Sequence, residues 1–156
     1  MTMKRIAFIL LSMSLLWSCS KETTIELVKV SDTGCAREEV ATRSADRAPE
    51  EIILEYSEEG LVVTLTNVEL NCSVKNGGVT CNLNSRGPEI RLEAFEKDGK
   101  TIRCTCPVDK VSTVLSGLSL GKEYTLYFTC NGSFAPITFT YSKNLKMVLD
   151  AGLYRL

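Results

Sequence analysis

Residues 118–130, LSLGKEYTLYFTC, carry the clearest structural signal in the chain. From Tyr124 to Cys130 every second residue is apolar or aromatic, in the order Tyr, Leu, Phe, Cys, and threonine fills two of the three positions between them. This period of two is that of a strand with one buried face. Gly121 precedes the run and supplies a residue that tolerates a tight turn. We therefore expect a turn followed by a strand over Tyr124–Cys130.

Short alternating runs with the same period lie on both sides of this stretch, from residue 51 onward. The six further expected strands are Ile52–Tyr56, Leu61–Leu70, Gly78–Leu83, Glu89–Phe95, Lys100–Cys106 and Ala135–Tyr141. Turn-forming residues separate them, and Asp98-Gly99 favours a hairpin between the fourth and the fifth of these. The only helix that we expect is a single turn around Val108–Leu115. About seven strands in roughly 100 residues predict an all-β sandwich.

Residues 118–124, LSLGKEY, resemble the L-x-P-G-x-x-Y motif that leads into a strand of fibronectin type III domains and related immunoglobulin-like sandwiches. Leu120 stands where that motif has proline. The resemblance implies an Ig-like or FnIII-like antiparallel β-sandwich. It also implies that the Tyr124 hydroxyl hydrogen-bonds to the backbone a few residues upstream, the arrangement called a tyrosine corner.

Residues 1–18 have the layout of a secretory signal peptide. Lys4 and Arg5 precede an apolar run over residues 6–17, which is shorter than the roughly 20 residues that a membrane-spanning helix needs. The run ends in LWSC, residues 16–19, which resembles the lipobox L-x-[S/A/G]-C of bacterial lipoproteins. That resemblance implies cleavage before Cys19 and lipid attachment to its thiol, so that the mature protein is anchored to a membrane.

Residues 19–48 are rich in small and charged side chains, which is typical of a flexible tether between the lipid and the domain that follows. A flexible chain of about 30 residues has an r.m.s. reach of roughly 30 Å. Four apolar residues interrupt the polar composition and could instead dock as a short strand: Ile25, Leu27, Val28 and Val30. We assign residues 49–156 to one disulfide-stabilised sandwich domain.

The chain contains no histidine. This excludes Ser-His and Cys-His catalysis, histidine-ligated metals and an imidazole pH switch. Removal of residues 1–18 takes two of the 18 basic residues away and leaves 16 against 19 acidic residues, a formal charge of −3. We expect no nucleic acid partner, because binding to phosphates needs a basic surface that displaces counterions. We also expect no cofactor, since the chain has none of the common nucleotide-binding motifs.

Cysteine is unusually frequent, with seven residues in a chain of 156. With Cys19 assigned to the lipid, six remain as candidates for disulfide bonds in an exported protein: Cys35, Cys72, Cys81, Cys104, Cys106 and Cys130. The sequence does not choose among their many possible pairings. Strand alternation places four of them on the same faces as apolar neighbours, and so toward a core: Cys81, Cys104, Cys106 and Cys130.

Cys104 and Cys106 are poor partners for each other, because same-face neighbours on one strand have parallel Cβ vectors. Cys35 lies in a polar stretch and is either free or tied to the domain. A zinc site of Cys72, Cys81, Cys104 and Cys106 is the alternative to disulfides, although the chain lacks the C-x₂-C pairs typical of structural zinc. We predict no metal.

The order Asn71-Cys72, Cys104-Thr105-Cys106 and the turn at 118–124 is similar to that of small cysteine-rich lipoproteins of Bacteroidetes-type bacteria. Members of that family carry N-C(-C) after one strand and C-x-C(-x-C) before the turn, and Ser73 stands where the second cysteine of the first motif would be. The resemblance implies an outer-membrane lipoprotein on the cell surface or on the periplasmic face. It implies no activity.

Two kinds of function remain. The one that we favour is a non-catalytic interaction or structural module at the bacterial cell envelope, with an envelope protein or a glycan as partner. The alternative is an envelope hydrolase or accessory glycan-processing protein that uses carboxylates alone, which requires two acidic groups to converge in a pocket. The acids that we considered fall in turns or at outward strand positions, as on a solvated surface: Glu89, Glu93, Asp98 and Asp109.

Overall fold

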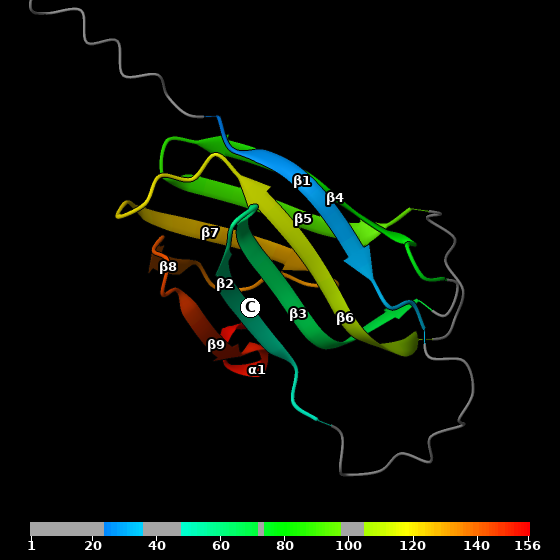
Figure 1. The fold of residues 1–156 in the computed structure, drawn as a ribbon. Coiled ribbons are helices and arrows are strands. Elements are labelled where there is room, and N and C mark those ends of the chain that lie inside the picture. The colour runs from blue at the N-terminus through cyan, green and yellow to red at the C-terminus, as the bar shows by residue number, and fades with distance from the viewer. Residues whose placement is uncertain (1–23, 36–47, 72–73, 98–104) are drawn as a thin grey trace, which may run out of the picture.

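The computed structural model describes residues 24–35, 48–71, 74–97 and 105–156, which form two β-sheets packed face to face (Figure 1). One sheet has five strands in the order β1-β6-β3-β2-β9, and the other has four in the order β4-β5-β7-β8. The elements are β1 (Glu26–Asp32), β2 (Glu51–Ser57), β3 (Gly60–Asn71), β4 (Val79–Arg86), β5 (Glu89–Glu96), β6 (Thr105–Ser116), β7 (Glu123–Cys130), β8 (Ile137–Thr140), β9 (Lys146–Asp150) and α1 (Ala151–Tyr154). The predicted all-β sandwich is confirmed.

Alternation in the sequence correctly predicts β2, β3, β4, β5, β7 and β8, with small shifts at their ends. The seventh predicted strand, Lys100–Cys106, and the Asp98-Gly99 turn fall wholly or mostly outside the described residues. The described strand after this gap, β6, pairs with β1 and β3 rather than with β5. The chain therefore passes from one sheet to the other between β5 and β6.

One strand pair departs from the expected antiparallel arrangement. β5 and β7 run parallel, with Glu89 opposite Thr125 and Ala94 opposite Cys130, whereas the other pairs of described strands are antiparallel. Immunoglobulin-type sandwiches consist of two antiparallel sheets. This protein is instead a nine-stranded sandwich, counted over the described residues, in which one sheet is mixed.

β1 corrects the predicted tether. Glu26–Asp32 is an edge strand of the five-stranded sheet and pairs with β6 from Glu26 opposite Ser116 to Asp32 opposite Val111. Ile25 is buried in the core, which explains why apolar residues interrupt an otherwise polar stretch. The sandwich therefore includes residues well before 49, and the docked-strand alternative for this segment is the correct one.

β6 shows that the expected helical turn around Val108–Leu115 is wrong, since this segment lies within a 12-residue strand. Val108 and Val111 are both buried, although they are three residues apart and strict alternation would turn one of them outward. A spacing of three between buried residues is more typical of a helix than of a strand.

In the neighbouring strand β3, the alternation of buried and outward side chains is interrupted opposite the same residues of β6. Leu65 and Val68 are both buried, and they lie opposite Val111 and Val108 in the ladder. Between them Asn67 has a left-handed φ of 54°, a conformation that asparagine tolerates better than most residues. Both strands thus change at this level which of their faces carries the buried side chains.

The predicted tyrosine corner is present at the start of β7. Tyr124 is only 2% exposed, and its hydroxyl oxygen accepts a hydrogen bond of 2.9 Å from the backbone N–H of Ser119. Leu126, Phe128 and Cys130 follow on the same buried face. The bond fixes the turn between β6 and β7 against the strand that follows it.

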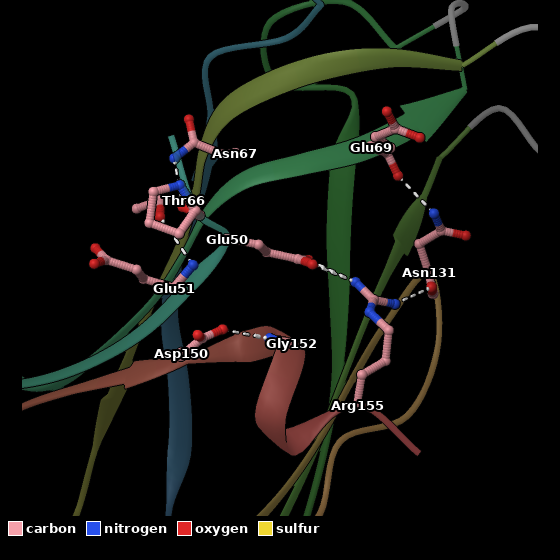
Figure 2. Close-up of polar contacts among 10 residues, drawn as sticks. Glu50, Glu51, Thr66, Asn67, Glu69, Asn131, Asp150, Gly152 and Arg155 are labelled. Atoms are coloured by element: carbon pink, nitrogen blue, oxygen red, sulfur yellow. Dashed lines mark hydrogen bonds and ion pairs between the residues drawn. The ribbon is translucent and has the colours of Figure 1, made fainter. Parts of the chain in front are cut away.

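β9 and α1 have no counterpart among the expected elements. Asp150 accepts from the N–H of Gly152 and begins the short helix. Arg155 follows it and donates from Nη2 to both carboxylate oxygens of Glu50, at 2.6 and 2.7 Å, and from Nη1 to the backbone oxygen of Asn131 at 2.8 Å (Figure 2). These contacts tie the last residues of the chain to the start of β2 and to the loop after β7.

Candidate functional site

An open depression of about 490 Å³ lies on the outer face of the four-stranded sheet, across β4, β5 and β7. Its outward side chains form two adjacent rows across the three strands. The rows are Asn84, Arg91 and Tyr127, and then Asn82, Glu93 and Thr129. The residues between them in sequence face the core, because side chains alternate along a strand. Leu92, for example, is 1% exposed.

Arg91 is the central charge of this surface. Its guanidinium carbon lies 4.8 Å from the centroid of the Tyr127 ring, and its Nη2 lies 3.6 Å from Oε2 of Glu89. Both partners of the ion pair are about half exposed, so the pair itself adds little to stability. The surface combines two amides, a guanidinium, a carboxylate, two hydroxyls and one aromatic ring, which are groups that recognise a polar partner.

The candidate acids that the structure describes, Glu89, Glu93 and Asp109, do not converge as glycoside hydrolysis requires. Glu89 and Glu93 lie on the same face of β5 but four residues apart, which corresponds to about 13 Å along a strand. The carboxyl pairs of glycosidases are roughly 5 to 9.5 Å apart. Asp109 is exposed on β6, in the other sheet, and Asp98 lies outside the described residues. This placement gives the hydrolase alternative no support.

Cys35 and Cys106 form a disulfide bond, with their Cα atoms 5.7 Å apart. Cys35 follows β1, and Cys106 lies near the start of β6. The bond therefore links the end of the N-terminal edge strand β1 to its neighbour β6. Of the two alternatives for Cys35, free or tied to the domain, the second is correct. Cys19, Cys72 and Cys104 lie outside the described residues, so their predicted roles stay predictions.

Cys81 and Cys130 are buried free thiols in the structure, which corrects their assignment as disulfide candidates. Both lie opposite Ala94 in the ladder, one on each side of β5. Their Cα atoms are thus two strand spacings apart, about 9 to 10 Å, which exceeds the reach of a disulfide. Burial raises the pKa of each thiol to about 12, so both stay protonated and unreactive near neutral pH.

The described residues contain no group of three or more His, Cys, Asp or Glu side chains that could hold a metal ion. In the zinc alternative, Cys81 and Cys106 are the two described members. Cys106 is bonded to Cys35, and Cys81 lies in the core of the other sheet. These two residues do not form half of a zinc site.

Asp32 is a residue that we did not single out from the sequence. Its carboxylate is buried and accepts from the backbone N–H groups of Gly34, Gly77 and Val79, at 2.9 to 3.1 Å. It therefore holds the loop before β4 against the end of β1. Asp-Thr-Gly after an apolar run is a turn signal that could have identified it. Its role is structural, since all three donors are backbone groups of the protein.

A scan against protein-family models, a search of curated proteins and a search of solved structures each gave no match to this chain. In the part of the chain that the structure describes, no helix is long and apolar enough to cross a bilayer.

Proposed function

We propose that this protein is a lipid-anchored, extracytoplasmic lipoprotein of the bacterial outer membrane that acts as a non-catalytic interaction module. The observation that carries the interaction role is the outer face of β4, β5 and β7, where two rows of polar side chains surround Arg91 and Tyr127. The anchor and the compartment rest on the signal sequence and on the lipobox at Cys19.

The disulfide between Cys35 and Cys106 supports an oxidising compartment, because such bonds persist outside the cytoplasm and are rare within it. The scattered placement of Glu89, Glu93 and Asp109 supports a binding role over a catalytic one. A mixed surface of donors and acceptors suits a polar partner, such as an envelope glycan or a polar protein surface.

The test is recovery of partners from envelope fractions by the full chain, expressed with its own signal sequence in a Gram-negative host. Protein and glycan fractions are offered separately to the native protein and to the double variant Arg91→Ala/Tyr127→Ala. Lys29→Ala, which removes an exposed positive charge from β1 in the other sheet, is the matched control.

We expect one fraction to bind the native protein and the control equally and to lose binding to the double variant. Binding that survives the double variant would move the interaction to another surface. Recovery of nothing beyond what the reduced, unfolded chain recovers would overturn the interaction role. Turnover of a glycan by the native protein would overturn the non-catalytic assignment.

A further inference from the structure

The N-terminal strand fixes where a lipid on Cys19 would lie relative to the sandwich. Ile25 is buried, and Glu26 opposite Ser116 begins the ladder between β1 and β6. At Gly117 an added Cβ would lie 2.2 Å from the backbone oxygen of Thr24, so the two backbones are in close contact. The chain is thus held to the sheet from Thr24 onward.

The start of β1, which Thr24 precedes, lies at one end of the sandwich together with the turns that join four strand pairs (Figure 1). The turn between β2 and β3 lies there, since Gly60 is packed against the backbone of Leu115. The loop from β6 to β7 and the end of β8 lie there too, joined by a hydrogen bond from Gly121 to the oxygen of Tyr141. The turn from β4 to β5 joins the same end, because Pro88 accepts from Thr125 near the start of β7. We call this set of turns the Thr24 end.

The length of chain between the lipid and this end is short. Thr24 is five residues after Cys19, and five extended residues span at most about 18 Å. The longest strands, β3 and β6, have 12 residues each, so the sandwich is about 40 Å long in their direction. If the opposite end rested on the bilayer, Thr24 would be about 40 Å above it, which the five residues cannot bridge.

We propose that the Thr24 end of the sandwich lies against the lipid surface of the membrane, and that the opposite end, with the Cys35–Cys106 disulfide and the loop held by Asp32, faces away from it. Leu120 at the tip of the β6–β7 loop is 54% exposed and becomes the apolar side chain nearest the bilayer. The polar surface around Arg91 and Tyr127 stays open at the side. This proposal rests on the proposed lipidation of Cys19.

The test uses single tryptophan reporters, because Trp17 is the only tryptophan in the chain and lies in the signal peptide. Leu120→Trp places one reporter at the Thr24 end. Leu156→Trp places the other at a site that is also exposed and whose backbone bonds to Ser133, in the loop after the far end of β7. The mature lipidated forms of both proteins, which begin at Cys19, are reconstituted into phosphatidylglycerol-containing vesicles with a nitroxide-labelled headgroup lipid that quenches nearby tryptophan fluorescence.

We expect severalfold stronger quenching of the Leu120→Trp reporter than of the Leu156→Trp reporter. Insertion of about 12 Gly and Ser residues after Ser20 adds a flexible reach of roughly 20 Å and should reduce the difference. Non-reducing peptide mapping of the Cys35–Cys106 bond verifies that each variant is folded.

Equal quenching of the two reporters in a protein whose mature N-terminus carries the lipid mass would overturn the orientation and leave the anchor intact. Stronger quenching of the Leu156→Trp reporter would do the same. A mature N-terminus without lipid at Cys19 would overturn both the anchor and the orientation.

Discussion

The side-chain hydroxyl of Tyr124 connects the turn between β6 and β7 to the buried ring of the same residue. Its ring is buried and its hydroxyl accepts from Ser119. Tyr124→Phe keeps the ring and removes the acceptor, so we expect a loss of about 1 kcal/mol in the free energy of unfolding. Urea unfolding followed by circular dichroism measures it. Tyr127→Phe, on the open outer face, is the control and should stay within about 0.5 kcal/mol of the native protein. Equal midpoints for the two variants would contradict the role of the corner.

The thiols of Cys81 and Cys130 make stability depend on alkaline pH. Burial raises the pKa of both from 9.0 to about 12, and the neighbouring Cys81 thiol adds to the effect at Cys130. Between pH 9.0 and about pH 12, the two thiols release their protons in the unfolded chain but retain them in the folded chain. Stability from the two thiols is therefore fully present below pH 9 and is lost progressively as the pH rises toward 12.

We expect the native protein to lose more stability between pH 8 and about pH 10 than the double variant Cys81→Ala/Cys130→Ala, because lysine titration is common to both. Urea midpoints across this range measure the difference. Alkylation of folded protein at pH 8 should leave both thiols unmodified until denaturant is added. Rapid alkylation without denaturant, or parallel pH profiles, would contradict the assignment of buried neutral thiols.

At the level of elements, the paired break in β3 and β6 depends on the left-handed backbone of Asn67. A β-branched residue there is strained by about 1 to 2 kcal/mol, whereas glycine is not. Both Asn67→Val and Asn67→Gly lose the hydrogen bond from the Asn67 side chain to Pro49. We therefore expect Asn67→Val to be less stable than Asn67→Gly by about that amount, measured by urea unfolding. If the two variants were equally stable, the positive φ would not be a constraint.

This break also explains what the sequence could and could not predict. Strands with unbroken alternation, such as β5 and β7, were predicted nearly to the residue. β6 was missed because its buried face changes between Val108 and Val111. β9 shows no such alternation, because Met147, Val148 and Leu149 are consecutive apolar residues, of which only Val148 is exposed in the structure. The outward positions of Arg91 and Tyr127 follow from alternation, but their adjacency does not, since it depends on a parallel pairing that no local signal encodes.

At the scale of the whole molecule, the Cys35–Cys106 disulfide closes a loop with a sequence separation of 71 residues. In the chain-entropy account, a cross-link of that length stabilises the folded state by about 4 kcal/mol. We expect Cys35→Ser/Cys106→Ser to lose about that much stability and to show faster amide exchange in β1 than in β3. Hydrogen exchange with mass spectrometry and urea unfolding give the two readings. The native protein under reducing conditions is the matched control and should behave as the variant does. Unchanged exchange in β1 would show that pairing with β6 holds it without the bond.

Under the proposed export and lipidation at Cys19, the placement of β1 implies an order of events during synthesis and export. Its only described ladder is with β6, whose matching residues extend to Ser116. A chain that crosses a membrane N-terminus first thus delivers β1 about 80 residues before its partner strand. Until β6 arrives, β1 has no partner to pair with, and the peptide bond before Cys19 lies close to chain that is still unfolded. A lipid-transferring enzyme and a signal peptidase would find this site accessible then, whereas the finished sandwich holds the chain from Thr24 onward. Maturation of the N-terminus would therefore precede the closing of the sheet.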